Sequence, residues 1–189
     1  MLLFWGGWLL AIVTVSSELV QLRQASASES RSGLSSTTVA SSLVVFAWWL
    51  AYSTRLSVWP GVATDVVTLC LAAAHARTVK LLHTKHVVGI VSLIALVVLL
   101  PITALGIIAT IGSAVRGLPQ LKTAWRAGDL TGVSAPYWTL QALTGLGWLV
   151  FGLASDAPWL GAFAVITAPV SLAIAWHATS KKHLQLASA

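Results

Sequence analysis

The sequence predicts an all-α integral membrane protein with seven transmembrane helices, arranged as two parallel three-helix repeats joined by a linker helix (3+1+3). The chain of 189 residues is 57% hydrophobic and only 8% charged. A soluble domain of this length needs far more polar surface, and long apolar stretches with few charges are typical of membrane spans. The second observation is that the chain repeats itself without a gap at a spacing of 99 residues.

The repeat is visible because residues of the same type recur at this 99-residue spacing. The matched pairs include Gly7 and Gly106, Ile12 and Ile111, Leu19 and Leu118, Gln21 and Gln120, Leu22 and Leu121, Ala25 and Ala124, Gly33 and Gly132, Ser35 and Ser134, Trp49 and Trp148, Leu50 and Leu149, Val66 and Val165, and Thr68 and Thr167. Each repeat holds three apolar segments, and one further segment lies between the repeats. Both repeats therefore cross the membrane in the same direction, with a solute cavity expected between the halves.

A bilayer core of about 30 Å requires roughly 20 helical residues. The first apolar segment lacks the basic residue that precedes a secretory signal sequence, so we expect it to be a retained helix. Pro101 interrupts the long uncharged run 87–115, and because proline lacks an N–H donor it predicts two helices there. We expect helices near 2–22, 35–54, 58–76, 80–99, 102–121, 134–154 and 157–178. They define a first repeat 1–77, a linker helix 78–100, a second repeat 101–178 and a mobile cytoplasmic tail 179–189.

The distribution of positive charge predicts the orientation. With seven helices and the N-terminus outside, ten of the eleven Lys and Arg residues lie on the cytoplasmic side, and only Arg55 lies outside. Six helices would divide the same residues five to six. Because positive residues prefer cytoplasmic flanks, we expect a plasma-membrane protein with the N-terminus outside and the C-terminus cytoplasmic. The basic residues form no continuous face, which argues against a nucleic-acid partner.

The second repeat carries an ordered set of motifs. It reads Gly117-Leu118-Pro119-Gln120-Leu121, then Gly132-Val133-Ser134, then Trp148-Leu149-Val150-Phe151-Gly152. The first repeat keeps Gln21, Gly33-Leu34-Ser35 and Trp49-Leu50-Ala51-Tyr52, with Val20 in place of the proline and Ser53 in place of the last glycine. This pattern resembles the PQ-loop family, most closely the SWEET and SemiSWEET sugar transporters. The resemblance covers the whole chain outside the linker helix and the tail.

The resemblance implies specific roles. In the family, the Trp and an Asn sixteen residues later line the solute pocket, and these positions match Trp49 with Asp65 and Trp148 with Ala164. The chain contains no Asn, so the substrate is open. An acid inside a membrane span usually faces a cavity or a partner, although Asp65 could also be an interfacial acid on a tilted helix. The two Trp residues could likewise be ordinary interfacial aromatics.

Helical spacing adds neighbours to this pocket. Gln141 and Thr144 precede Trp148 on one helix face, and Thr68 lies one turn beyond Asp65. Ser42 and Thr167 are the repeat matches of Gln141 and Thr68. The alternative for each is a hydroxyl or amide that only bonds backbone carbonyls or joins neighbouring helices.

Two further groups of residues are expected to serve movement. Pro119 removes a backbone hydrogen bond, and the resemblance implies a hinge there together with the motif residues Gln120 and Gln21. Two pairs of opposite charge from opposite halves could close the two ends of the path. They are Glu18 with Arg116 at the cytoplasmic ends of helices, and Arg55 with Asp156 outside. Independent solvated charges are the alternative.

These observations predict a transporter that moves a small polar solute by alternating access, with a sugar as the favoured solute. A proton-coupled or cationic amino-acid transporter is the first alternative, because of Asp65. A membrane cargo receptor of the same fold is the second. We expect no enzyme, no cofactor and no metal, since no catalytic or phosphate-binding motif is present and the histidines are too few at any one place. The expected partners are the solute and the lipid bilayer, and a homo-oligomer remains open.

Overall fold

The computed structural model describes residues 2–27, 35–78, 84–126, 130 and 133–187, and every regular element among them is a helix. The helices are α1 (Leu2–Ala27), α2 (Ser36–Arg55), α3 (Trp59–Thr78), α4 (Thr84–Val98), α5 (Ile102–Arg126), α6 (Ala135–Ala154), α7 (Trp159–Ala162) and α8 (Ala164–Ala187). Only Phe163 separates α7 from α8, so together they form the predicted seventh segment. The predicted all-helical fold is confirmed, and so is the break at Pro101 between α4 and α5.

Three predicted helix ends were wrong. Helix α1 continues to Ala27 and α5 to Arg126, so part of each predicted loop is helical. The predicted mobile tail instead extends α8 to Ala187. The reason is the same in each case, because these stretches contain no Gly or Pro and are rich in residues with good helix propensity. As a result, Pro119 lies inside α5 and not at its end.

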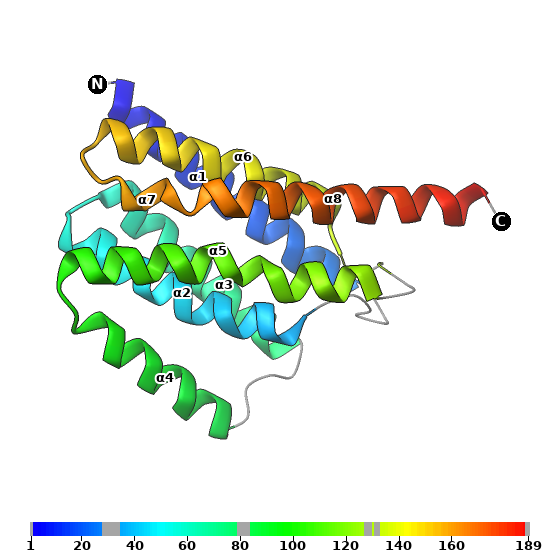
Figure 1. Cartoon of the computed structure of the whole chain (residues 1–189), viewed down its shortest axis with the longest axis horizontal. Helices are drawn as coiled ribbons and strands as arrows, with labels where there is room; N and C mark the ends of the chain where they lie inside the picture. Colours follow the sequence, from blue (N-terminus) through cyan, green and yellow to red (C-terminus); the bar gives the residue numbers. More distant parts are fainter. Residues whose placement is uncertain (1, 28–34, 79–83, 127–129, 131–132, 188–189) are drawn as a thin grey trace.

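The helices form two groups that face each other. Helices α1, α2 and α3 form the group of the first half of the chain, and α5, α6 and α8 form that of the second half. Helix α3 packs on both α1 and α2, and α8 packs on both α5 and α6. The two groups meet where α1 contacts α6 and α2 contacts α5. Successive long helices run back and forth between the two ends of the molecule, so α1 and α5 run in the same direction (Figure 1). Helix α4 lies obliquely at the edge of the bundle, mainly against α2 (Figure 1).

Two glycines allow the groups to approach closely. A Cβ atom on Gly7 of α1 would lie 2.8 Å from Cε2 of Phe151 on α6. A Cβ atom on Gly106 of α5 would lie 2.7 Å from Cε2 of Tyr52 on α2. The two glycines are one repeat apart, and so are the two rings. The repeat in the sequence therefore corresponds to an equivalent helix contact on each side of the interface between the groups.

The polarity of the molecule is that of a membrane protein. Ser17, Ser53 and Thr68 are completely buried, whereas Leu99 and Trp176 are 82% and 77% exposed. Within the part of the chain that the structure describes, three helical stretches are long and apolar enough to cross a membrane, namely Phe4–Ala27, Ile102–Arg126 and Trp159–Ser180. Polar side chains inside and apolar side chains outside indicate a membrane-embedded protein.

We predict that Gly7→Leu lowers the free energy of unfolding by about 1–3 kcal/mol, because its side chain would collide with the Phe151 ring. The matched control is Gly6→Leu, since a Cβ atom at Gly6 would meet no atom within 4 Å. Both variants are compared with the parent by denaturant unfolding in detergent. Equal destabilisation by the two substitutions would contradict a close contact at Gly7.

Candidate functional site

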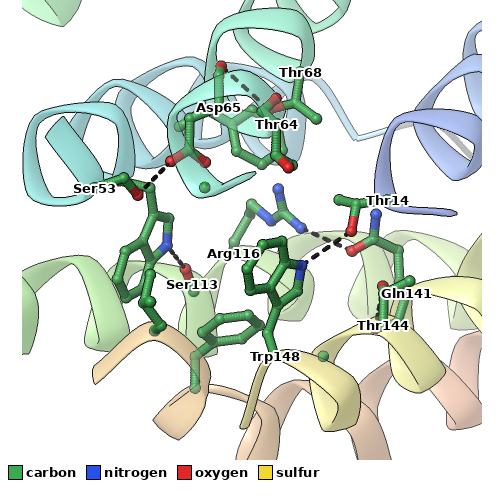
Figure 2. A pocket seen from close by; sticks show the side chains of 16 residues that line it. Thr14, Ser53, Thr64, Asp65, Thr68, Ser113, Arg116, Gln141, Thr144 and Trp148 are labelled. Atoms are coloured by element: carbon green, nitrogen blue, oxygen red, sulfur yellow. Dashed lines mark hydrogen bonds between the residues drawn. The ribbon is translucent and has the colours of Figure 1, made fainter. Parts of the chain in front are cut away.

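A cavity of about 70 Å³ lies between the two groups of helices (Figure 2). It brings together six of the predicted pocket residues, which are Trp49, Asp65, Thr68, Gln141, Thr144 and Trp148. It is also lined by Thr14, Phe46, Ser53, Gly61, Thr64, Ser113, Arg116, Gly145, Leu160 and Phe163. Residues of both groups therefore line one cavity that contains charged and polar side chains.

The two predicted Trp residues bridge the groups in the same way. The indole Nε1–H of Trp49 donates to Ser113 Oγ on α5 at 2.7 Å. The indole Nε1–H of Trp148 donates to Thr14 Oγ1 on α1 at 3.0 Å. Both indoles are buried, and donors and acceptors are each 99 residues apart. A buried indole N–H needs an acceptor, so each Trp is held in place by the opposite half.

The first half supplies a carboxyl group to the cavity. Asp65 on α3 is buried, and its Oδ2 accepts a hydrogen bond from Ser53 Oγ on α2 at 2.8 Å. The corresponding residues of the second half are Ala164 and Gly152. The first half therefore contributes an acidic residue to the cavity at this position, and the second half does not.

The second half supplies a guanidinium group. Arg116 lies ten residues before the end of α5 at Arg126, which corrects its predicted position at a cytoplasmic helix end. Its Nη2 donates to Gln141 Oε1 at 3.4 Å, and its Cζ lies 4.8 Å from the centre of the Phe46 ring. This distance is typical of a cation–π contact. Because α5 continues for ten residues beyond Arg116, the residue lies inside the helix, and its side chain lines the cavity.

Gln141 also connects the cavity to Glu18. Its Nε2 donates to Glu18 Oε1 at 2.9 Å and to Ser17 Oγ at 3.2 Å, and Tyr137 Oη donates to the same Glu18 oxygen at 3.2 Å. Glu18 lines a second, smaller cavity of about 30 Å³. The predicted pair of Glu18 and Arg116 is thus not a direct ion pair, because the Gln141 amide bridges the two groups.

The motif glutamines join the halves near one end of the bundle. Gln120 Oε1 accepts the backbone N–H of Ser35 at 2.9 Å, and Gln21 Oε1 accepts that of Ser134 at 3.3 Å. The two Ser residues also cap α2 and α6 through their hydroxyl oxygens. Each glutamine therefore holds the first turn of a helix from the other half. We call these two contacts the glutamine latches.

The remaining predicted residues fall elsewhere. Ser42 lines the second cavity, and neither Ala164 nor Thr167 lines the first. Arg55 donates to the carbonyl oxygens of Val98 and Leu100, both at 2.6 Å, at the C-terminal end of α4. It forms no ion pair with Asp156 in the described structure, because these carbonyl groups take its donors. The predicted external gate is therefore not formed in this conformation.

Two of the predicted hydroxyl groups line the cavity but donate inside their own helices. Thr68 Oγ1 donates to the Thr64 carbonyl at 2.9 Å, and Thr144 Oγ1 donates to the Leu140 carbonyl at 2.8 Å. Each retains its oxygen as an acceptor. Among the described residues, no group of three or more His, Cys, Asp and Glu residues is placed to hold a metal ion.

Sequence reasoning missed Thr14 and Ser113, the acceptors of the two indoles. They are a Thr and a Ser at the 99-residue spacing, so allowing similar residues in the repeat comparison would have found them. Ser53 was noted only for its departure from a motif glycine. Its contact with Asp65 depends on the packing of α2 against α3 and has no sequence signal.

We predict that Trp49→Phe and Ser113→Ala each lower the free energy of unfolding by about 0.5–1.5 kcal/mol, because both remove the same buried hydrogen bond. The double variant should cost clearly less than the sum of the single variants. Trp59→Phe is the control, since Trp59 is exposed. Strictly additive losses in this double-mutant cycle would exclude a coupling between the two side chains.

Comparisons with known proteins leave the site to be interpreted from its own geometry. No family model, no curated protein and no solved structure matches this chain.

Proposed function

We propose that the protein is a membrane transporter that moves a small polar solute by alternating access through the cavity between its two helix groups. The single observation that carries this proposal is the polar cavity itself, which is lined by charged and aromatic residues of both halves. Polar and charged groups at this depth are costly in a membrane and mark solute pathways. Because both halves line the cavity, a movement of one half against the other would change which side can reach it.

We propose the 3+1+3 arrangement for the membrane-spanning chain, with the N-terminus outside and the C-terminus in the cytoplasm. The parallel course of α1 and α5 and the peripheral position of α4 support this arrangement (Figure 1). Arg116 no longer counts as a cytoplasmic flank, so nine of the eleven positive residues remain on that side (ten minus one). The imbalance still favours this orientation.

The glutamine latches suggest how one end opens and closes. They join α5 to the start of α2 and α1 to the start of α6, near the predicted cytoplasmic end. Breaking both latches would let the halves separate there. The resemblance to the PQ-loop family, which includes these glutamines, gives the same part of the chain a role in movement. Pro119, one residue before Gln120, remains our predicted hinge.

The solute class has two candidates. The resemblance to sugar transporters and the two indoles of the cavity favour a sugar, whose apolar C–H faces stack on aromatic rings. A charged solute of the amino-acid type is favoured by a different observation, namely that Asp65 and Arg116 both line the cavity.

A peptide-binding cargo receptor needs a basic residue in its cavity, and Arg116 meets this requirement. One water molecule needs about 10–15 Å³, so in this conformation the 70 Å³ of the cavity suits about five to seven non-hydrogen atoms, which is fewer than a hexose or a peptide contains.

We expect the purified protein in proteoliposomes to take up at least one member of a panel of sugars and short amino acids faster than protein-free liposomes. The panel is measured with and without a pH gradient, since the gradient separates proton-coupled from facilitated uptake. Trp148→Ala should reduce this uptake, because it removes a cavity wall that both halves share. Uptake equal to that of protein-free liposomes for every solute would contradict the proposed function.

We predict that Gln21→Ala combined with Gln120→Ala favours the state open at the latch end. Each lost hydrogen bond shifts the equilibrium by about 2- to 10-fold. The readout is the rate at which an impermeant thiol reagent modifies Ser42→Cys in a Cys70→Ser background, because Ser42 lines the small cavity beside the latches.

Gln24→Ala is the matched control for this experiment, since Gln24 is an exposed glutamine on the same helix as Gln21. It should leave the modification rate unchanged. An unchanged rate in the double latch variant would show that the latches do not hold this end closed.

A further inference from the structure

The cavity is symmetric in its scaffold and asymmetric in its charge. The two indoles and their hydroxyl acceptors are equivalent in the two halves. The charged positions are not, because Asp65 corresponds to Ala164 and Arg116 corresponds to Ser17. One half therefore presents a carboxyl group and the other a guanidinium group. A solute held by both must offer a different group to each half.

Arg116 has an unused donor inside the cavity. Its Nη1 is buried and has no hydrogen-bond partner within the described chain, while its Nη2 reaches only Gln141. Figure 2 shows the guanidinium between Asp65 and Trp148 in the middle of the cavity. A buried charged donor without an acceptor is costly, and a carboxylate is the acceptor that a guanidinium binds best. An anionic group of a solute would complete this site.

Asp65 offers the complementary group on the opposite wall. Its carboxyl group accepts a hydrogen bond from the neutral hydroxyl of Ser53, and no Lys, Arg or His of the described structure forms an ion pair with it. A carboxylate in such a place accepts hydrogen bonds from a cationic or polar donor. The ammonium group of a solute would supply both the donor and the opposite charge.

We infer, on the basis of the proposed transport function, that the cavity binds a short zwitterion of the amino-acid class. Its carboxylate accepts from Arg116 Nη1, and its ammonium group donates to the carboxylate of Asp65. The volume of the cavity suits about five to seven non-hydrogen atoms, which is the size of glycine or alanine, whereas a hexose is about twice as large. Size and charge therefore lead to the same class of solute.

Three molecules of equal size test this inference on the purified full-length protein in detergent by calorimetric titration. L-alanine carries both charges, L-alaninamide lacks the carboxylate, and L-lactate lacks the ammonium group. We expect alanine to bind about 10- to 100-fold more tightly than either of the others, since each lacks one charge-assisted hydrogen bond. Equal affinity for all three molecules would overturn the inference.

Two variants assign each charge to its residue. Arg116→Gln should bind alanine and alaninamide equally, and Asp65→Asn should bind alanine and lactate equally. General structural damage would not produce this crossed pattern. Arg126→Gln is the control, because Arg126 is an exposed arginine at the end of the same helix. A parental preference for alanine over alaninamide in Arg116→Gln would overturn the assignment.

Arg116→Lys provides a second variant if Arg116→Gln does not fold. It keeps the charge and should keep a reduced preference for alanine over alaninamide. Equal binding of alanine and alaninamide by the folded Lys variant would contradict the inference.

Failure of the inference is distinct from failure of the proposed function. Uptake of a sugar without binding of alanine overturns only the zwitterion, whereas no uptake of any solute overturns the transport function itself.

Discussion

The hydrogen bonds between the two halves are the interaction on which the rest of the structure depends. The outer surfaces of the helices are as apolar as lipid, so the hydrophobic effect contributes little to the association of the two groups within a membrane. Close packing at Gly7 and Gly106 and a small set of polar contacts must hold them together. Trp49 with Ser113 and Trp148 with Thr14 form one such set in the cavity. An unpaired polar group at this depth costs far more than it would at a wet surface, which makes these contacts specific as well as stabilising.

The repeat explains why these contacts occur in pairs. A residue that reaches across the interface from the first half has an equivalent that reaches back from the second half. This holds for the indoles, for the glutamine latches and for the glycine contacts with Tyr52 and Phe151. The same kinds of contact therefore occur twice in the structure, once from each half. Under the proposed function, a movement that loosens one member of a pair would loosen its equivalent in a similar way.

The charges break this symmetry where a solute would bind. Asp65 belongs to the first half and Arg116 to the second, so a solute that contacts both joins the halves through itself. Under the proposed function, a relative movement of the halves would change the distance between these two groups and hence the affinity for the solute. Gln141 extends the same network to Glu18 and Tyr137, which line the smaller cavity. The proposed solute site is therefore connected to the smaller cavity by hydrogen bonds. The binding site and the moving interface would then be a single network.

The sequence by itself determined the helical class, the positions of the helices and the break at Pro101, because these follow from local apolar runs and from a missing N–H donor. The repeat spacing also singles out the two indoles, because Trp49 and Trp148 lie 99 residues apart. Helix ends were less predictable, since α1, α5 and α8 continue through polar residues that are compatible with either a helix or a loop.

Only the tertiary structure decided which polar residues meet. The sequence places Arg116 at a membrane surface, whereas in the structure α5 continues ten residues past it and its side chain lines the cavity. The sequence suggests that Arg55 pairs with Asp156, whereas in the structure Arg55 donates to carbonyl oxygens at the end of α4. Such contacts join residues far apart in the chain, so they depend on how helices are placed and turned relative to each other. The local pattern of the sequence does not contain that information.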